Sequence, residues 1–219
     1  MASQALPIRD RRAPEERRAL LLEAAGAVIA VRGFDGATVR DVAKQANVST
    51  GLLHHYFDSF PDLLAEAFAQ EAEFDKHRLS AAAAAIPDPL ARLDTLVALY
   101  APRADDPGWF LWFSAWSAAA RQPKLRQSAE RIHREWASQF EEVLAAGTLS
   151  RAFTCEDPPG TTRRLMSLMD GLATQVVAIR SLEACDVARD IAIAVGAETG
   201  LTPEDFPEVA RIGTGPLPG

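Results

Sequence analysis

The chain has 219 residues, of which 48% are hydrophobic and 24% are charged. These proportions are typical of a globular protein and exclude disorder over the whole length. The length corresponds to one or two domains. The formal net charge of −7 argues against a nucleic-acid-binding protein, because contacts to phosphate groups require a basic surface.

The sequence carries no signal for a membrane span or for secretion. No apolar run reaches the ~18 residues that a membrane-spanning helix needs. Residues 1–12 contain three arginines, but no apolar stretch that ends in a cleavage motif follows them. Cys155 and Cys185 lie far apart and without a nearby group of histidines, which favours reduced thiols over a disulfide or a metal site. We therefore expect a cytoplasmic protein without a cofactor, a metal or a membrane contact.

Apolar residues recur at helical spacing along almost the whole chain, and alternating strand patterns are absent. Residues 80–85 and 115–120 are rich in alanine, the residue with the highest helix propensity. Proline, glycine and asparagine break the pattern into about nine helices with short connections. The sequence therefore predicts an all-α protein. It is expected to begin with a flexible basic arm at 1–13 and to end with a flexible tail at 203–219. Between them we expect two helical domains, at 14–60 and 61–202, that are joined by a continuous helix.

The first helix of the N-terminal domain is expected over about residues 15–32. Gly33 follows it as a left-handed cap, and Phe34 can fold back on the helix that it ends. Apolar side chains recur on one face of this helix, and the residues expected to point inward are Leu21, Ala25, Val28 and Ile29.

Two short helices follow, joined by a tight turn. Thr38 caps the first of them, over residues 39–46, with Asp41 completing a capping box. Asn47 tolerates the left-handed conformation that the turn requires, and Ser49 caps the next helix. Small or apolar residues fix the crossing of the two helices, and those expected to do so are Val42, Ala43, Val48, Leu53 and Tyr56. Ala46 and Phe57 are also expected to face inward.

This pattern is typical of a helix-turn-helix. In that geometry the exposed face of the third helix can enter the major groove of DNA, and free amides at the helix starts suit phosphate oxygens. The same shape also occurs as an ordinary helical corner in proteins that do not bind DNA, so the pattern alone leaves both interpretations open. The residues expected on the exposed face are Thr50, Gly51, Leu52, His54 and His55.

Residues 32–43 (RGFDGATVRDVA) and 46–57 (ANVSTGLLHHYF) resemble the N-terminal DNA-binding domain of TetR-family transcriptional repressors. The resemblance continues in register to Leu64 and covers about fifty residues. Within the family, the chain is similar to the branch that contains the betaine/choline-pathway repressor. The stretches that resemble the C-terminal regulatory domain of that branch are WFSAW at 112–116, PKLR at 123–126 and MDGL at 169–172.

The resemblance implies a homodimeric repressor that binds a palindromic operator in double-stranded DNA. A small-molecule effector is expected to release it by shifting the long fourth helix as a lever. The family usually has lysine at the start of that helix, where this chain has Phe60, so Lys44 or an arginine of the arm becomes the candidate for the missing phosphate contact. By position, the implied DNA-binding residues are Thr38, Arg40, Lys44, Ser49, Thr50, Gly51, Leu52, His54, His55 and Tyr56.

The charge is divided unevenly along the chain. Residues 1–60 hold eight Lys/Arg and seven Asp/Glu, a net charge of +1, whereas the remaining 159 residues hold 15 Lys/Arg and 23 Asp/Glu, a net charge of −8. The acidity belongs to the C-terminal part, so the whole-chain charge does not exclude DNA binding. The arginines of the arm either reach the minor groove or only solubilise the chain.

Four aromatic residues share one face of a predicted helix, because Trp109, Trp112, Phe113 and Trp116 follow at i, i+3, i+4 and i+7. Core packing explains any one of them, but three tryptophans in eight residues also favour a ligand pocket. An aromatic pocket in an acidic domain suits a cationic effector, such as a quaternary ammonium compound, or a flat apolar one. The further residues expected at the pocket are His133, Trp136, Asp170, Thr174 and Gln175.

The last two predicted helices, at about 161–181 and 186–200, carry a wide apolar surface. Two adjacent helices of this kind in a small protein suggest a two-fold, four-helix interface, and the resemblance implies the same. The residues expected in this homodimer interface are Leu165, Leu168, Leu172, Val176, Ile179, Val187, Ile191 and Val195.

Two other classes of function are weaker. An enzyme is disfavoured because no Ser/His/Asp, Cys/His or metal-ligand set has a useful spacing, and the adjacent His54 and His55 point in different directions on a helix. A helical ligand-binding or scaffold protein that no longer binds DNA has its best support in Phe60. The sequence therefore favours a ligand-responsive transcriptional regulator.

Overall fold

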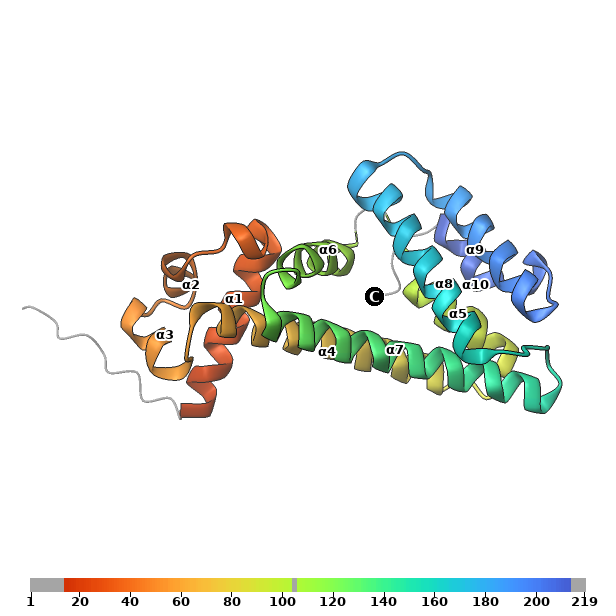
Figure 1. Cartoon of the computed structure of the whole chain (residues 1–219), viewed down its shortest axis with the longest axis horizontal. Coiled ribbons are helices and arrows are strands. Elements are labelled where there is room, and N and C mark those ends of the chain that lie inside the picture. The colour runs from red at the N-terminus through yellow and green to blue at the C-terminus, as the bar shows by residue number, and fades with distance from the viewer. Residues whose placement is uncertain (1–13, 104–105, 214–219) are drawn as a thin grey trace, which may run out of the picture.

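The computed structural model describes residues 14–103 and 106–213 of the chain. Every regular element within these residues is helical, which confirms the predicted all-α fold (Figure 1). A π-helical turn, Thr174–Ile179, extends the eighth helix, and the tenth is a single short turn. The helices are α1 (Pro14–Gly36), α2 (Val39–Gln45), α3 (Thr50–Tyr56), α4 (Phe60–Ala84), α5 (Pro89–Tyr100), α6 (Pro107–Ala119), α7 (Pro123–Ser150), α8 (Pro158–Ala173), α9 (Ala184–Thr199) and α10 (Pro207–Ala210).

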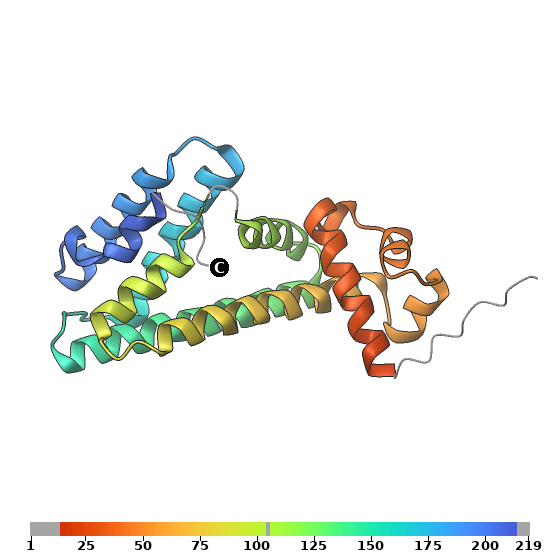
Figure 2. The ribbon, with the colours of Figure 1, turned by 180° about the vertical axis from the view of Figure 1, so that it is seen from behind.

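Helices α1 to α3 form one end of an elongated molecule (Figures 1 and 2). From this end α4 and α7 run side by side along most of its length, and α5, α8, α9 and α10 pack together at the far end. Helix α4 packs against both α1 and α7 and so contacts both ends of the molecule. Helix α6 lies between α1 and α7. No helix in the described part of the chain is long and apolar enough to cross a membrane.

Aspartate followed by proline sets the start of three helices. Asp88, Asp106 and Asp157 are the N-caps of α5, α6 and α8, and each carboxylate accepts a hydrogen bond from a backbone amide of the first turn. Proline fits the next position because an N–H in the first turn of a helix has no acceptor within the helix, so its absence costs nothing. The boundaries of these three helices are therefore set by local chemistry.

Both positions of the N-terminal domain that were predicted to leave the ordinary helical conformation have a positive φ, although Gly33 kinks α1 and does not end it. Gly33 has φ 67° and ψ 177°, and it kinks α1 so that Phe34 turns inward and is only 3% exposed. Helical turns resume beyond the kink as far as Gly36, two residues before the N-cap of α2. Asn47 has φ 54° in the turn between α2 and α3.

The prediction of a flexible tail at 203–219 is wrong for residues 203–213, which fold back on α5 and α9. Phe206, Val209 and Ile212 are at most 5% exposed. The buried carboxylate of Asp94 on α5 accepts hydrogen bonds from the backbone amides of Glu208 and Val209, at 2.8 and 3.0 Å. The proline and glycine content suggested disorder, but three apolar residues at helical spacing give this segment a buried face. Residues 1–13 and 214–219 of the predicted arm and tail lie outside the described residues.

We expect Phe206→Ala to lower the free energy of unfolding by about 3–5 kcal/mol, because it leaves a cavity between the C-terminal segment and its neighbours. Urea unfolding followed by circular dichroism measures this change. Glu204→Ala, at an exposed position of the same segment, serves as the control. Equal stability of Phe206→Ala and the wild type would show that the segment does not stabilise the fold.

Candidate functional site

Helices α2 and α3 form the predicted helix-turn-helix. Val42, Leu53 and Phe57 are at most 6% exposed. At the turn, the amide of Val48 donates a hydrogen bond to the carbonyl of Ala43 over 2.9 Å. Ala43 is itself buried, and its small side chain lets the two helices approach. These contacts fix the orientation of α3 and leave its other face directed away from the core.

The residues implied in DNA binding all reach the surface of this domain. Leu52 and Tyr56 are half-buried. A Cβ added at Gly51 would meet no atom within 4 Å, so the backbone of α3 is open to close approach there. The exposed members are Thr38, Arg40, Lys44, Ser49, Thr50, Gly51, His54 and His55.

The caps of α2 and α3 differ from the sequence prediction in detail. The Thr38 hydroxyl accepts a hydrogen bond from the amide of Asp41 at 3.2 Å and donates to its carboxylate at 2.6 Å, so the reciprocal bond of a full capping box is made to the hydroxyl. The same hydroxyl, followed by the charge of Arg32, holds the pKa of Asp41 below its usual value. Ser49 occupies the N-cap position of α3 without a side-chain capping hydrogen bond.

Phe60, which stands where the family usually has lysine, is a packing residue. It is half-buried at the start of α4 and contacts the hydrophobic core of the domain. Ser59 caps the same helix by accepting a hydrogen bond from the amide of Asp62 at 3.2 Å. A cation approaches this helix start from elsewhere in the chain, because Lys124 of α7 forms an ion pair with Asp62 at 2.8 Å. No sequence pattern indicates this role of Lys124, since only the packing of α7 against α4 brings it there.

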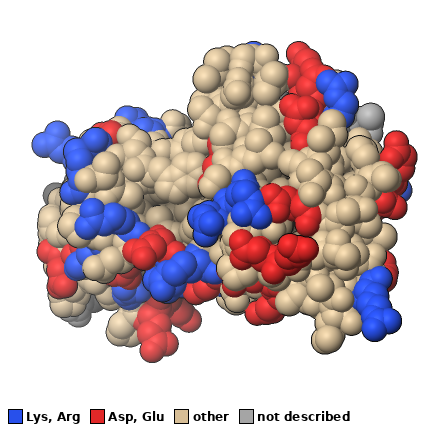
Figure 3. Space-filling model, turned by 45° about the vertical axis from the view of Figure 1, so that its right-hand side comes forward, with Lys and Arg blue, Asp and Glu red and all other residues tan. Residues whose placement is uncertain are grey.

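Lys and Arg side chains gather over the end of the molecule that holds α1 to α3, interspersed with Asp and Glu (Figure 3). The mixture agrees with the weak net charge of residues 1–60. A surface of this kind supports modest non-specific attraction to DNA, so specific contacts must supply much of the affinity.

A cavity of about 290 Å³ lies between α4, α5, α6 and α7. Of the residues predicted for a ligand pocket, Trp109, Trp112 and Trp116 line it from α6, and His133 and Trp136 line it from α7. The helical face that the aromatic spacing indicated therefore faces this cavity. Four tryptophans therefore contribute rings to the wall, and such rings suit a small organic molecule.

The other four predicted pocket residues do not line the cavity. Phe113 packs behind it, with ring centroids 5.9 Å from Trp109 and 5.7 Å from Trp116. Asp170 lies behind the wall, where its carboxylate accepts a hydrogen bond from the lining residue Tyr100. Thr174 and Gln175 are exposed on the π-helical turn, which carries them away from the cavity.

Tyr100, at the end of α5, is a cavity residue that sequence analysis missed. Its hydroxyl donates a hydrogen bond to the carboxylate of Asp170 at 3.0 Å, and its ring packs edge-on against Trp109 and Trp136, with centroids 5.7 and 5.4 Å apart. Burial raises the pKa of Tyr100 well above its usual value, and burial also raises the pKa of Asp170. The phenol therefore stays protonated and keeps its ring fixed in the wall.

Three carboxylates complete the cavity lining. Glu71 and Asp75 come from successive turns of α4, and Asp106 comes from the N-cap of α6. Burial raises the pKa of Asp75 above its usual value, and the charge of Asp106 acts in the same direction. A cation in the cavity would offset this loss of solvation. The four-residue spacing of Glu71 and Asp75 shows in the sequence that both lie on one face of a helix. It does not show that this face lines a cavity.

The basic residues of the lining have acidic neighbours. Arg78 lies 3.6 Å from Asp75, and Lys76 forms an ion pair with Glu135 of α7. Burial lowers the pKa of Arg103, while Asp106 acts against this shift. The opposite charges around the cavity thus nearly balance.

Six of the eight residues expected in the dimer interface are buried within the chain itself, so that part of the prediction is wrong. Apolar spacing marked the inner face of the last two helices, which packs on the core of the same chain. Leu168 and Ile179 remain exposed, at 36% and 63%, and Ile193 of α9 is 51% exposed. The six buried residues, none more than 7% exposed, are Leu165, Leu172, Val176, Val187, Ile191 and Val195.

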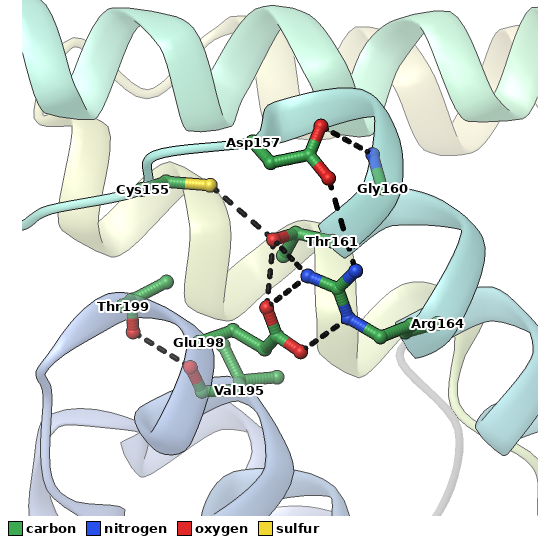
Figure 4. A network of polar contacts seen from close by, with 8 residues as sticks. All are labelled: Cys155, Asp157, Gly160, Thr161, Arg164, Val195, Glu198 and Thr199. Atoms are coloured by element: carbon green, nitrogen blue, oxygen red, sulfur yellow. Dashed lines mark hydrogen bonds and ion pairs between the residues drawn. The ribbon is translucent and has the colours of Figure 1, made fainter.

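A network of polar contacts joins α8 to α9 (Figure 4). The Arg164 guanidinium donates to one carboxylate oxygen of Glu198 from Nε at 2.6 Å, and the Thr161 hydroxyl donates to the other at 2.8 Å. The thiol of Cys155 donates in turn to the Thr161 hydroxyl over 3.5 Å. The hydrogen bond from Arg164, and then that from Thr161, lowers the pKa of Glu198 to about 2.

Comparison with known proteins agrees with this geometry. The family described as "Bacterial regulatory proteins, tetR family" matches residues 21–67, and the one described as "BetI-type transcriptional repressor, C-terminal" matches residues 89–195. The HTH-type transcriptional regulator BetI of Burkholderia mallei is 34% identical over 169 residues, which are 72% of this chain and 80% of that protein. The chain belongs to the TetR family. It is a DNA-binding transcriptional repressor with a C-terminal domain of the BetI type.

Solved structures place this TetR-family protein in the same fold. A transcriptional regulator from Saccharomonospora viridis, crystallised in complex with choline, is 27% identical and covers 83% of this chain and 94% of its own, with a TM-score of 0.71. A transcriptional regulator from Pseudomonas aeruginosa PAO1, at 22% identity, covers 92% of this chain and 96% of its own, with a TM-score of 0.70.

In this TetR-family protein, the ion pair between Arg164 of α8 and Glu198 of α9 should make a contribution to stability that is lost in acid. The ordinary pKa of a glutamate is 4.5 and that of folded Glu198 is about 2, so the ionised carboxylate stabilises the fold above pH 4.5, and this contribution is lost as the pH falls from 4.5 toward 2. Glu198→Gln should lower the free energy of unfolding at pH 7 by about 1–2 kcal/mol, since the carboxylate is a quarter exposed. Urea unfolding at pH 7 and pH 3 should show this deficit shrinking at the lower pH. A deficit of the same size at both pH values would contradict the assignment.

Proposed function

We propose that this protein is a homodimer that represses transcription from a palindromic operator and leaves it when a small organic cation enters the cavity. The observation that carries the proposal is the presence, in one chain, of an exposed recognition face on α3 and a cavity whose lining combines aromatic rings with charged side chains of both signs. Membership of the TetR family establishes that the protein is a transcriptional repressor. The homodimer, the palindromic operator, the cationic ligand and the release of DNA are what we propose here.

Operator recognition is assigned to α3 and the start of α2. Thr50 and His54 are exposed on the face of α3 that can meet base edges, and Gly51 allows close approach of the backbone. Thr38 and Arg40 are exposed at the start of α2, where phosphate contacts would fix the orientation of the domain. Two copies of α3 about one DNA turn apart would read a palindromic site.

An organic cation is the ligand class that suits the cavity best. Ring faces attract cations, and Tyr100, Trp109 and Trp136 hold one another in fixed edge-on geometry. A cation would also offset the lost solvation of Asp75, which a flat apolar ligand would not. The choline bound to the relative from Saccharomonospora viridis is a quaternary ammonium compound and belongs to this class.

The dimer is assigned to the outer face of α8 and α9. Leu168 of α8, Ile179 of the π-helical turn and Ile193 of α9 are apolar and exposed, in contrast to the buried residues that apolar spacing suggested. Two copies related by a two-fold axis would bury them in a four-helix contact. The proposed cation then favours a dimer conformation in which the two α3 helices no longer match the operator.

Two variants should separate the two binding activities of the wild-type protein. His54→Ala should weaken operator binding about tenfold or more and leave choline affinity unchanged, because it removes a side chain from the DNA face alone. Trp109→Leu should weaken choline binding about fivefold or more and leave operator affinity unchanged, because it removes a ring but keeps an apolar side chain. The operator is a fragment selected in vitro with the wild-type protein, and fluorescence anisotropy and titration calorimetry measure the two affinities.

His77→Ala and Phe110→Leu are the matched controls, since both replace exposed side chains outside the DNA face and the cavity lining. Both should behave as the wild type in both assays. Failure of the wild type to select any DNA sequence would contradict the repressor, and operator binding unaffected by saturating choline would contradict release by this cation.

A further inference from the structure

Helix α6 lines the cavity with one face and contacts the DNA-binding domain with the other. Trp112 and Trp116 line the cavity. Ser114 is two residues from each of them, which places it about 200° around the helix from both tryptophans. Because α6 packs mainly against α1 and α7, this opposite face meets the DNA-binding domain. A displacement of the tryptophans therefore moves Ser114 as part of the same short helix.

Ser114 holds the kink of α1. Its hydroxyl oxygen accepts a hydrogen bond from the amide of Phe34 over 2.9 Å. This amide follows directly on Gly33, where the backbone leaves the helical conformation, and a buried amide at such a point needs an acceptor. The contact is close, since a Cβ added at Gly33 would lie 2.9 Å from Ser114 Oγ. The hydrogen bond thus fixes the distance between α6 and the kink.

The kink leads directly to the DNA-binding helices. Phe34 precedes Thr38, the N-cap of α2, by four residues. The Phe34 ring packs edge-on against Phe68 of α4, with centroids 6.1 Å apart, and Phe68 packs edge-on against Trp112, with centroids 5.1 Å apart. A continuous row of rings therefore joins the cavity wall to the segment before α2, beside the hydrogen bond of Ser114.

A second polar contact lies just beyond the end of α6. Both carboxylate oxygens of Asp35 accept hydrogen bonds from Nη2 of Arg121, at 3.1 and 2.9 Å. Both side chains are more than 60% exposed, so salt screens this ion pair and its contribution is small. The hydrogen bond that the half-buried Ser114 accepts from Phe34 joins uncharged groups, so salt does not weaken it.

We propose that α6 transmits the occupancy of the cavity to the DNA-binding domain through the hydrogen bond between Ser114 and the Phe34 amide. A cation that displaces the tryptophan face of α6 moves Ser114 and the kink of α1 with it. The start of α2 and the recognition helix α3 then leave the positions that match the operator. The inference rests on the proposed function and assigns its transmission to α6 instead of to a shift of α4 alone.

The test uses full-length wild type, Ser114→Ala and the control Ser117→Ala, which replaces an exposed serine on the same helix. Operator affinity is measured with and without saturating choline, and choline affinity is measured separately. Wild type and Ser117→Ala should lose operator affinity by the same factor on addition of choline, typically 5- to 150-fold for such coupling. For Ser114→Ala this factor should fall at least threefold, while its choline affinity stays unchanged.

Hydrogen exchange on the wild type gives a second readout that does not depend on the stability of any variant. Choline should speed exchange of the amides in residues 33–37, because the acceptor of the Phe34 amide moves. A coupling factor for Ser114→Ala equal to that of the wild type, together with unchanged exchange at 33–37, would overturn the inference and leave the proposed function standing. An absence of any choline effect on operator binding by the wild type would overturn both.

Discussion

The packing of Phe68 between two other rings is the contact on which the junction of the two domains depends. Phe68 is 0% exposed on α4, with Phe34 of the DNA-binding domain on one side and Trp112 of the cavity wall on the other. Protein interiors are packed as densely as crystals, so a shift of one of these rings displaces its neighbours. The DNA-binding helices therefore cannot turn independently of the cavity. A shared aromatic core, and not a flexible linker, connects recognition to sensing.

The features that the sequence could predict are those decided by local chemistry. Gly33 and Asn47 stand where the backbone takes positive φ, and an aspartate before a proline marks the start of α5, α6 and α8. The exposed face of α3 could be predicted because the buried positions Leu53 and Phe57 fix the rotation of the helix. The tryptophan spacing on α6 likewise identified the face that meets the cavity.

The features that the sequence could not predict depend on where a distant helix packs. Tyr100 and Asp75 reach the cavity only because α4 and α5 lie beside α6 and α7. Leu165 has the same apolar spacing whether its face meets the chain's own core or a second subunit, so periodicity could not tell these cases apart. The docking of residues 203–213 depends on Asp94, more than a hundred positions earlier, and no local pattern announces such a partner.

Occupancy of the cavity should move the DNA-binding helices of a dimer. Electron–electron double resonance between spin labels at Gln45→Cys, an exposed position on α2, measures this directly in a Cys185→Ser background, where the remaining Cys155 is buried. We expect a defined distance between the two labels of the dimer, and a shift of that distance when choline saturates the protein. The same distance with and without bound choline, or no dipolar signal at all, would contradict this expectation.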